Sequence, residues 1–499
     1  MQRSVMFLAT SLLMMLSAVY AASAVGCGGT KEGSGFVTPD AAAGMTDATM
    51  ALFDGPMLGM QGDGPTPTPG CMGMQCQSQI DSCESNGKSP TTITGTVYDP
   101  AGALPLYNVY VYIPNGTPLA IAPGNPTCTA CQAPASGSPV IGTLTDAKGN
   151  FTLQQGTTDK WGVPSGADIP LVIQVGKWRR QIKIPTVTKC TANAIPNPAS
   201  PALRLRLPAM SSEGDMPMMA FTSGCDPAEC FLRHIGIADS EFVPPTSTTG
   251  HVHFYTGQSG SQIPGGNQAA QTYQWWSSEA NLLKYDIIFN ACECSENDRG
   301  PAAYPAMHSY LSAGGRLFTT HYYFNWFTPP DGSGGYVSDF NGVVNWMPNG
   351  FGGTGMGYFI DTTFPKGKAF ADWMQDNKIT QTYGSVNLVD TRNDMGTSKP
   401  ESSRWIYNGN SPTDPAYSEM YMSFNTPVGK PPASQCGRAV FSDVHLSGSS
   451  DTTPFPQECA GADPTGMYST NEKALEFLFF DLSSCVQDNS QPPPPPMNQ

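Results

Sequence analysis

The chain has 499 residues, enough for two or three domains, and is acidic, with a formal net charge of −15. This charge argues against nucleic acid as a partner, because binding phosphates requires an excess of cations. Only 13% of the residues are charged, whereas 53 are Gly, 46 are Pro and 14 are Cys. Such a composition is typical of a loop-rich exported protein with disulfides rather than of a cytosolic enzyme.

Residues 1–26 have the pattern of an export signal. Arg3 precedes an apolar stretch over residues 5–22 that contains no acidic residue. Residues 24–27 then resemble a bacterial lipobox, which implies that Cys27 is lipidated. Because no Asp follows Cys27, the resemblance further implies an outer-membrane lipoprotein, on the periplasmic or the cell-surface side. Ordinary signal cleavage after Ala24 is the alternative.

Two short regions separate this signal from the first expected domain. Residues 27–70 are rich in Gly, Ala, Met, Pro and Thr without a sustained period, which predicts a flexible tether. Residues 71–91 form a small cysteine-containing segment. We expect disulfides there rather than a zinc site, because no fourth ligand lies nearby.

Residues 92–208 show short alternating strands between Gly- and Pro-containing turns, a pattern that predicts a β-sandwich. Residues 95–102, 108–111 and 145–151 resemble the carboxypeptidase regulatory-like domain. The resemblance implies a transthyretin-like sandwich, grouped with carbohydrate-binding-like folds. Such a module is either a spacer or a glycan-binding domain.

Residues 216–485 predict an α/β domain. Residues 285–291 suit a buried strand, the next apolar residues recur at helical spacing, and residues 316–320 form a second strand that ends at His321. Strand, helix and strand in this order indicate a parallel sheet covered on both faces. An earlier strand over residues 216–223 is followed by a helix for which Asp226 is the expected cap. Residues 486–499 are a Pro-rich tail.

Residues 285–293, 310–321 and 438–445, with the closing helix, resemble the class I glutamine amidotransferase-like fold, especially its ThuA-like branch. The resemblance implies a flavodoxin-like parallel sheet with long insertions. The two domains together resemble a group of secreted bacterial lipoproteins. In the amidotransferases a nucleophilic cysteine stands on a glycine-flanked turn after a strand. Cys292 occupies that point without the glycines, so the resemblance assigns it no catalytic role.

Ligands of open α/β sheets bind outside the carboxyl ends of the strands. Glu293, His321 and His445 follow strands of the expected sheet and are candidates for a metal or acid–base cluster. His251 and His253, two apart on a strand, share a side and are weaker candidates for a metal pair. Hydrogen-bonded structural histidines are the alternative. We expect no cofactor, and a divalent metal is the one ion that these residues would suit.

Cysteines around the first helix of the α/β domain suggest two disulfides. Cys225 and Cys230 flank that helix, and Cys292 and Cys294 follow a strand. If the two strands are neighbours, Cys225–Cys294 and Cys230–Cys292 are the expected pairs. Lipidation of Cys27 would leave thirteen cysteines, so at least one is unpaired in a monomer.

The other cysteines allow fewer inferences. Cys436 and Cys459 bracket a loop and are an expected pair. Cys128 and Cys131 form a CxxC motif on an insertion of a β-domain, where a structural disulfide is expected, either between the two or with Cys190.

These observations predict a non-catalytic surface lipoprotein, anchored in the membrane through its N-terminal lipid, that binds a glycan or another envelope protein. The alternative is a hydrolase or sugar-modifying enzyme that uses Glu293, His321 and His445. The two hypotheses differ in whether those side chains converge. A purely structural role is a third hypothesis.

Overall fold

The computed structural model describes residues 71–78, 83–128, 131, 133–157, 159–264, 275–328, 340–347, 357–414, 416–446, 453–459 and 469–496. The expected signal peptide, the lipidation candidate Cys27 and the tether lie outside these residues. Thr66–Gln499 belong to one compact unit. The described residues are rich in sheet and contain few helices.

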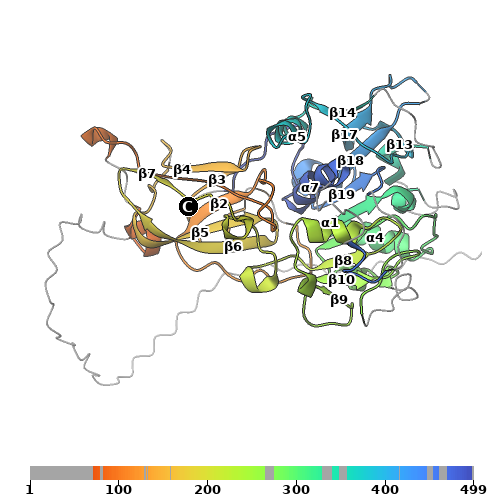
Figure 1. Ribbon diagram of the computed structural model, residues 1–499, viewed down its shortest axis with the longest axis horizontal. Coiled ribbons are helices and arrows are strands. Elements are labelled where there is room, and N and C mark those ends of the chain that lie inside the picture. Colours follow the sequence, from red (N-terminus) through yellow and green to blue (C-terminus); the bar gives the residue numbers. More distant parts are fainter. Residues whose placement is uncertain are drawn as a thin grey trace, which may run out of the picture. The chain divides into compact units, whose positions relative to one another are not determined.

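The N-terminal part of this unit contains two small sheets, with the orders β4-β1-β7 and β3-β2-β5-β6 (Figure 1). The alternating pattern over residues 92–208 does correspond to short strands, as predicted. Gly149 has a φ of +70° and closes the tight turn between β3 and β4, where the Asp146 carboxylate accepts two backbone N–H bonds. The bounds are β1 Thr92–Thr96, β2 Tyr110–Pro114, β3 Pro139–Leu144, β4 Asn150–Gln154, β5 Gly166–Val175, β6 Trp178–Val187 and β7 Ala192–Ala194.

A ten-stranded sheet follows, with the order β15-β14-β17-β18-β19-β12-β11-β8-β10-β9. Its strands are β8 Met219–Thr222, β9 Phe242–Val243, β10 Val252–Tyr255, β11 Ile287–Asn290, β12 Arg316–Thr320, β14 Tyr358–Ile360, β15 Ser385–Val386, β17 Ser402–Asn408, β18 Glu419–Thr426 and β19 Gly437–Ser442. Two further strands, β13 Val344–Trp346 and β16 Met395–Ser398, pair separately.

The large sheet has a parallel half and an antiparallel half. The neighbours from β19 through β12, β11, β8 and β10 to β9 all pair in parallel, as the strand–helix–strand pattern predicts. On the other side of β19, strands β18, β17, β14 and β15 extend the sheet, and each pairs antiparallel with its neighbour. The sequence did not predict that extension.

Helices cover both faces of the parallel half, because alternate strand residues point to opposite sides. Phe289, Phe318 and Val440 pack with α1 and α7, whereas Ile288 and Leu317 pack with α4. A capping box joins Ser469 to Glu472 at the start of α7. The helices are α1 Ala228–His234, α3 Glu279–Leu282, α4 Ala303–Ser312, α5 Pro365–Asp376 and α7 Thr470–Ser483. None of those in the described ranges has both the length and the apolar composition that a membrane crossing requires.

Six disulfides link the described residues, and most of the expected pairings are wrong. Cys225 does pair with Cys294, since β8 and β11 are neighbours. Cys230 pairs with Cys459 instead of Cys292, because its helix turns it toward residues 453–459. The full set is Cys71–Cys76, Cys83–Cys190, Cys128–Cys436, Cys131–Cys485, Cys225–Cys294 and Cys230–Cys459.

The CxxC motif does not close on itself. Cys128 lies with its Cα 4.6 Å from that of Cys436, and Cys131 with its Cα 5.1 Å from that of Cys485. The expected bridges Cys128–Cys131 and Cys436–Cys459, and a bridge from either CxxC cysteine to Cys190, are therefore wrong. The two disulfides therefore link the insertion that carries the motif to the residue before β19 and to a residue just after α7.

Candidate functional site

Polar side chains converge where four neighbouring parallel strands end. Cys292 follows β11, His321 follows β12 and His445 follows β19. Asp226 follows β8 at the adjacent position of the sheet. Carboxyl ends of parallel strands meet along one edge, so the fold itself brings together residues that lie far apart in sequence.

Cys292 is the free cysteine of the described residues, and its side chain is fully buried. Its sulfur lies 3.3 Å from Nδ1 of His321. The backbone N–H groups of Cys294, at 3.4 Å, and Tyr322 donate to the same sulfur. Burial raises the pKa of the Cys292 thiol well above its ordinary value, and the nearby Asp226 carboxylate adds to this effect. Without a further cation the group is therefore a neutral thiol.

His321 begins the 3₁₀ turn η6 (His321–Trp326) with a φ of +37°, a left-handed conformation that costs energy for a residue with a side chain. Nε2 lies 3.4 Å from Oδ2 of Asp394, and Nδ1 is directed at the Cys292 sulfur. Burial, reinforced by His445 and Arg392, lowers the pKa of His321 to about 2. The imidazole is thus neutral, and a proton on Nε2 would leave the lone pair of Nδ1 for the sulfur or for a metal.

His445 is held by Asp226, whose Oδ1 lies 2.5 Å from Nδ1 of the imidazole. The other Asp226 oxygen accepts a bond from the Thr320 hydroxyl at 3.2 Å. Burial opposes protonation of His445, but the Asp226 carboxylate prevails, so the pKa of His445 is raised. Nε2 is buried and has no hydrogen-bond partner among the described residues. A buried nitrogen left in this way is costly unless something outside the described chain satisfies it.

Two carboxyl groups, those of Asp394 and Asp443, lie beside His321. The backbone N–H of Asp394 donates to Oδ2 of Asp443 at 2.5 Å, and both residues are fully buried. Burial and the Asp394 charge together raise the pKa of Asp443 well above its ordinary value. Ionisation of Asp443 beside Asp394 is therefore disfavoured.

Cys292, His321 and His445 each offer one ligand atom, and these atoms lie within 4.8 Å of one another. One sulfur and two imidazole nitrogens are the ligand types of Zn²⁺ and related transition metals. Both imidazoles are oriented by carboxylates through their other nitrogen, as is usual for metal-bound histidines. The residues present therefore fit a metal ion.

Comparison with known proteins gives little beyond the geometry. No family model and no curated protein matches the sequence. A solved structure described as a ThuA-like protein from Bacteroides uniformis has 10% identity and a TM-score of 0.29, covering 52% of this chain and 88% of its own. The mmIFT52 N-terminal domain has 12% identity and a TM-score of 0.28, covering 53% of this chain and 97% of its own. At these TM-scores neither likeness defines the fold.

Glu293, the third member of the predicted cluster, lies in a separate contact. Its Oε2 accepts a bond from Arg299 at 2.6 Å, and both side chains are fully buried. Oε1 accepts the backbone N–H of Gln258 at 2.9 Å. Arg299 also lies over the rings of Trp276 and Tyr323. The structure thus brings together His321 and His445 but places Glu293 in a buried ion pair.

His251 and His253 have separate partners. Nδ1 of His251 lies 3.0 Å from a Glu241 oxygen, and Nδ1 of His253 lies 2.9 Å from the Tyr285 hydroxyl. These contacts match the structural alternative for the two histidines.

Sequence reasoning missed Asp226 and Asp394. Asp226 precedes a Pro at the start of a helix, the ordinary signal of an N-cap, yet its carboxylate reaches His445 and no side chain caps α1. Asp394 follows a loop without any period. Asp226 lies 219 residues from His445 in sequence. The order of the strands would have to be known before the two could be predicted to lie close together.

Proposed function

We propose that this chain is an extracytoplasmic binding protein that holds a thiophilic divalent transition-metal ion, of the Zn²⁺ class, through Cys292, His321 and His445. The observation that carries the proposal is the buried Nε2 of His445, which has no hydrogen-bond partner among the described residues. Asp226 engages Nδ1, so Nε2 is the nitrogen left for a metal.

The surrounding charges favour a divalent ion. Loss of the Cys292 proton on metal binding leaves a thiolate, and Asp226 supplies a second negative charge beside His445. These two charges offset those of a divalent cation, whereas the neutral imidazole of His321 adds none. The N–H groups of Cys294 and Tyr322 would support the thiolate sulfur.

The cellular setting belongs to the same proposal. Six disulfides support an oxidising compartment. The sequence of residues 1–27 supports lipid anchoring at Cys27 in the outer membrane. We also propose that the N-terminal part is a transthyretin-like domain and that the large sheet belongs to a flavodoxin-like, ThuA-like domain. The sequence resemblances support both assignments.

Thiol-dependent hydrolysis or group transfer is the second candidate, favoured by one specific observation. Cys292, His321 and Asp394 form a chain of contacts at 3.3 Å and 3.4 Å, which is the order nucleophile, base and orienting carboxylate. Two facts weigh against it: Cys292 is fully buried, and the pKa values of both Cys292 and His321 disfavour a thiolate–imidazolium pair.

Cobalt substitution tests the proposal. Co²⁺ is added to metal-free protein purified without reductant, and the absorption spectrum and bound metal are measured. We expect one equivalent of Co²⁺, a thiolate-to-cobalt charge-transfer band, and displacement by Zn²⁺. Cys292→Ser should lose the band, whereas His253→Gln, altered at a histidine outside the centre, should keep it. Absence of the band in the unmodified protein would refute the metal site.

Alkylation separates the two candidates. If Cys292 is a nucleophile, iodoacetamide should modify it rapidly in the native, metal-free protein, as peptide mass spectrometry would show. A buried metal ligand should react only after unfolding, or slowly, and Zn²⁺ should slow the reaction further.

A further inference from the structure

A groove of about 860 Å³ lies in the antiparallel half of the large sheet, and none of the three proposed metal ligands lines it. Its wall includes residues of β17 and β18, the segment 361–364 that precedes α5, and residues 488–490 of the C-terminal tail. The groove is therefore separate from the proposed metal centre.

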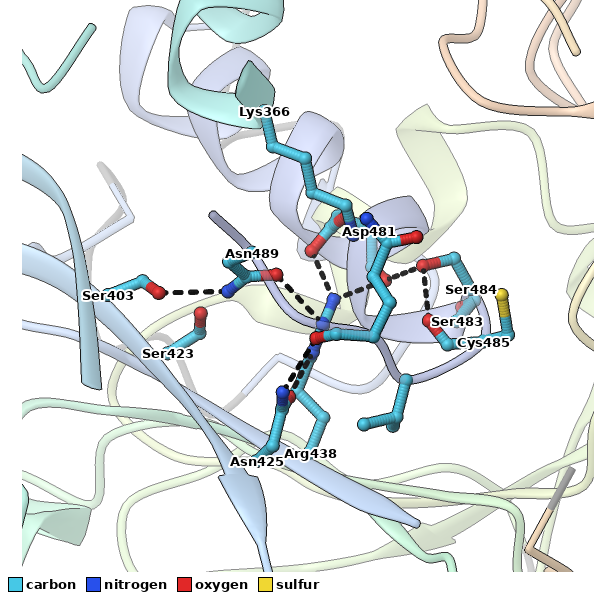
Figure 2. Close-up of polar contacts among 12 residues, drawn as sticks. Lys366, Ser403, Ser423, Asn425, Arg438, Asp481, Ser483, Ser484, Cys485 and Asn489 are labelled. Atoms are coloured by element: carbon cyan, nitrogen blue, oxygen red, sulfur yellow. Dashed lines mark hydrogen bonds and ion pairs between the residues drawn. The ribbon is translucent and has the colours of Figure 1, made fainter. Parts of the chain in front are cut away.

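One side of the groove rests on a buried ionic network (Figure 2). Asp481 of α7 lies 2.5 Å from Nζ of Lys366 and 2.6 Å from Nη1 of Arg438, and all three side chains are buried. Arg438 in turn donates to the amide oxygens of Asn425, at 2.9 Å, and Asn489, at 3.1 Å. The guanidinium therefore fixes which end of each amide is its oxygen, and both amides line the groove.

This network ends at a hydroxyl on the groove wall. The amide nitrogen of Asn489 donates to the Ser403 hydroxyl at 2.9 Å, as Figure 2 shows. A serine hydroxyl that accepts a bond keeps its own proton for donation. Because the donors and acceptors are held by a buried charge, they are oriented before any ligand arrives, which lowers the entropy cost of binding.

A second hydrogen-bonded chain lines the other side. Nε and Nη2 of Arg404 both lie against Oδ2 of Asp361, at 2.9 Å and 2.7 Å, and Nη1 donates to the Tyr417 hydroxyl at 2.8 Å. Tyr417 in turn donates to Glu419, which accepts further bonds from the backbone N–H and the hydroxyl of Ser398. The Arg404 charge is thus paired with that of Asp361 within the wall, and the chain ends again at a serine hydroxyl.

The lining restricts the class of ligand. The charged groups of the wall are Asp361, Glu401, Glu419, Asp488, Arg404 and Lys430, with no excess of cations. A phosphate-bearing ligand would find no compensating charge, and a lipid chain would leave these polar groups unsatisfied. Phe364 and several prolines add apolar surfaces beside the hydroxyls and amides. Oriented amides and hydroxyls beside apolar surfaces suit a ligand with many hydroxyl groups.

We propose that this groove binds a neutral oligosaccharide, oriented by Asn425, Asn489, Ser403 and Ser398 and resting on the apolar surfaces. The groove would act independently of the metal centre, because no residue is shared between them.

Isothermal titration calorimetry with four neutral hexasaccharides tests the proposal: maltohexaose, cellohexaose, chitohexaose and mannohexaose. We expect at least one to bind with a dissociation constant on the order of 10–1000 μM. Ser403→Ala/Asn489→Ala should weaken that binding by roughly tenfold, the loss of about two hydrogen bonds. Gln181→Ala/Thr186→Ala, which removes the same two functional groups from the exposed surface of β6, should not change it.

Three results would contradict the proposal that the groove binds a neutral oligosaccharide. No heat from any of the four hexasaccharides at about 1 mM would overturn the proposal. So would equal binding by the Ser403→Ala/Asn489→Ala variant with a melting temperature like that of the unmodified protein. Tighter binding of the anionic hexagalacturonate than of every neutral sugar would contradict the charge argument. Cobalt binding, measured on the same samples, reports the metal centre separately.

Discussion

Asp226 and His445 lie 219 residues apart in sequence, yet Oδ1 of one lies 2.5 Å from Nδ1 of the other. The contact crosses the parallel half of the sheet, from the end of β8 to the end of β19. It fixes the proton of His445 on Nδ1 whenever Nε2 has a ligand.

Replacing Asp226 by Asn should weaken metal binding without abolishing it. The neutral amide keeps the shape but no longer raises the basicity of His445, so we expect a loss of about 10–100-fold in affinity. Competition between Zn²⁺ and a chromophoric chelator measures the change. Asp239→Asn, at an exposed ion pair with Arg233, is the matched control. Unchanged affinity in Asp226→Asn would remove Asp226 from the centre.

Replacing Glu293 by Gln should affect stability rather than metal binding. Its partner Arg299 is fully buried, so the change leaves a cation without its counter-charge, at a cost of about 3 kcal/mol. Urea denaturation measures the free energy of unfolding, and Glu293→Gln/Arg299→Met should recover part of the loss. Loss of the cobalt band at unchanged stability would instead place Glu293 in the metal centre.

Removing the Cys128–Cys436 bridge with two serines should cost about 2–4 kcal/mol of unfolding free energy. The neighbouring Cys131–Cys485 bridge remains, so the loop released is roughly 50 residues rather than the whole separation of 308. Removing both bridges should therefore cost more than twice as much unfolding free energy as removing Cys128–Cys436 alone, because the second bridge then closes a longer loop. Equal stability of single and double removals, measured by urea denaturation without reductant, would contradict this.

Glu476 and Asp99 should make stability fall as the pH rises. Burial raises the pKa of Asp99 from 3.8 to about 7, and burial together with the Asp99 charge raises the pKa of Glu476 well above its ordinary value. The folded state thus binds more protons than the unfolded state, and stability present below pH 4 is lost as the pH rises through about 7.

Replacing Glu476 by Gln tests this linkage. The amide cannot ionise, so we expect a gain in unfolding free energy at pH 8 that exceeds the gain at pH 4 by roughly 1–3 kcal/mol. Denaturation at the two pH values measures it, with Glu279→Gln, at an exposed position of α3, as the control. A gain of equal size at both pH values would contradict the proposed ionisation.

The periodic parts of the fold could be predicted from the sequence. Strand β11, helix α4 and strand β12 follow from the spacing of apolar residues, and the edge rule for parallel sheets pointed to His321 and His445. Glu293 was included because it adjoins Cys292, but neighbouring residues beyond a strand point in different directions, and here Arg299 holds the carboxylate. The antiparallel extension and the partners of Cys128, Cys131 and Cys230 depend on contacts between distant segments, for which no local pattern exists.

The strand ends that supply Asp226, Cys292, His321 and His445 have a consequence for how the protein matures. No pair among the three proposed metal ligands lies closer than 29 residues in sequence, so a newly synthesised chain would have no preformed chelating segment among them. The proposed centre would form only when β8, β11, β12 and β19 lie side by side in the sheet. Metal uptake would then be a late step in folding. The molar ratio of bound metal to protein in a preparation would measure the fraction of molecules in which the sheet is complete.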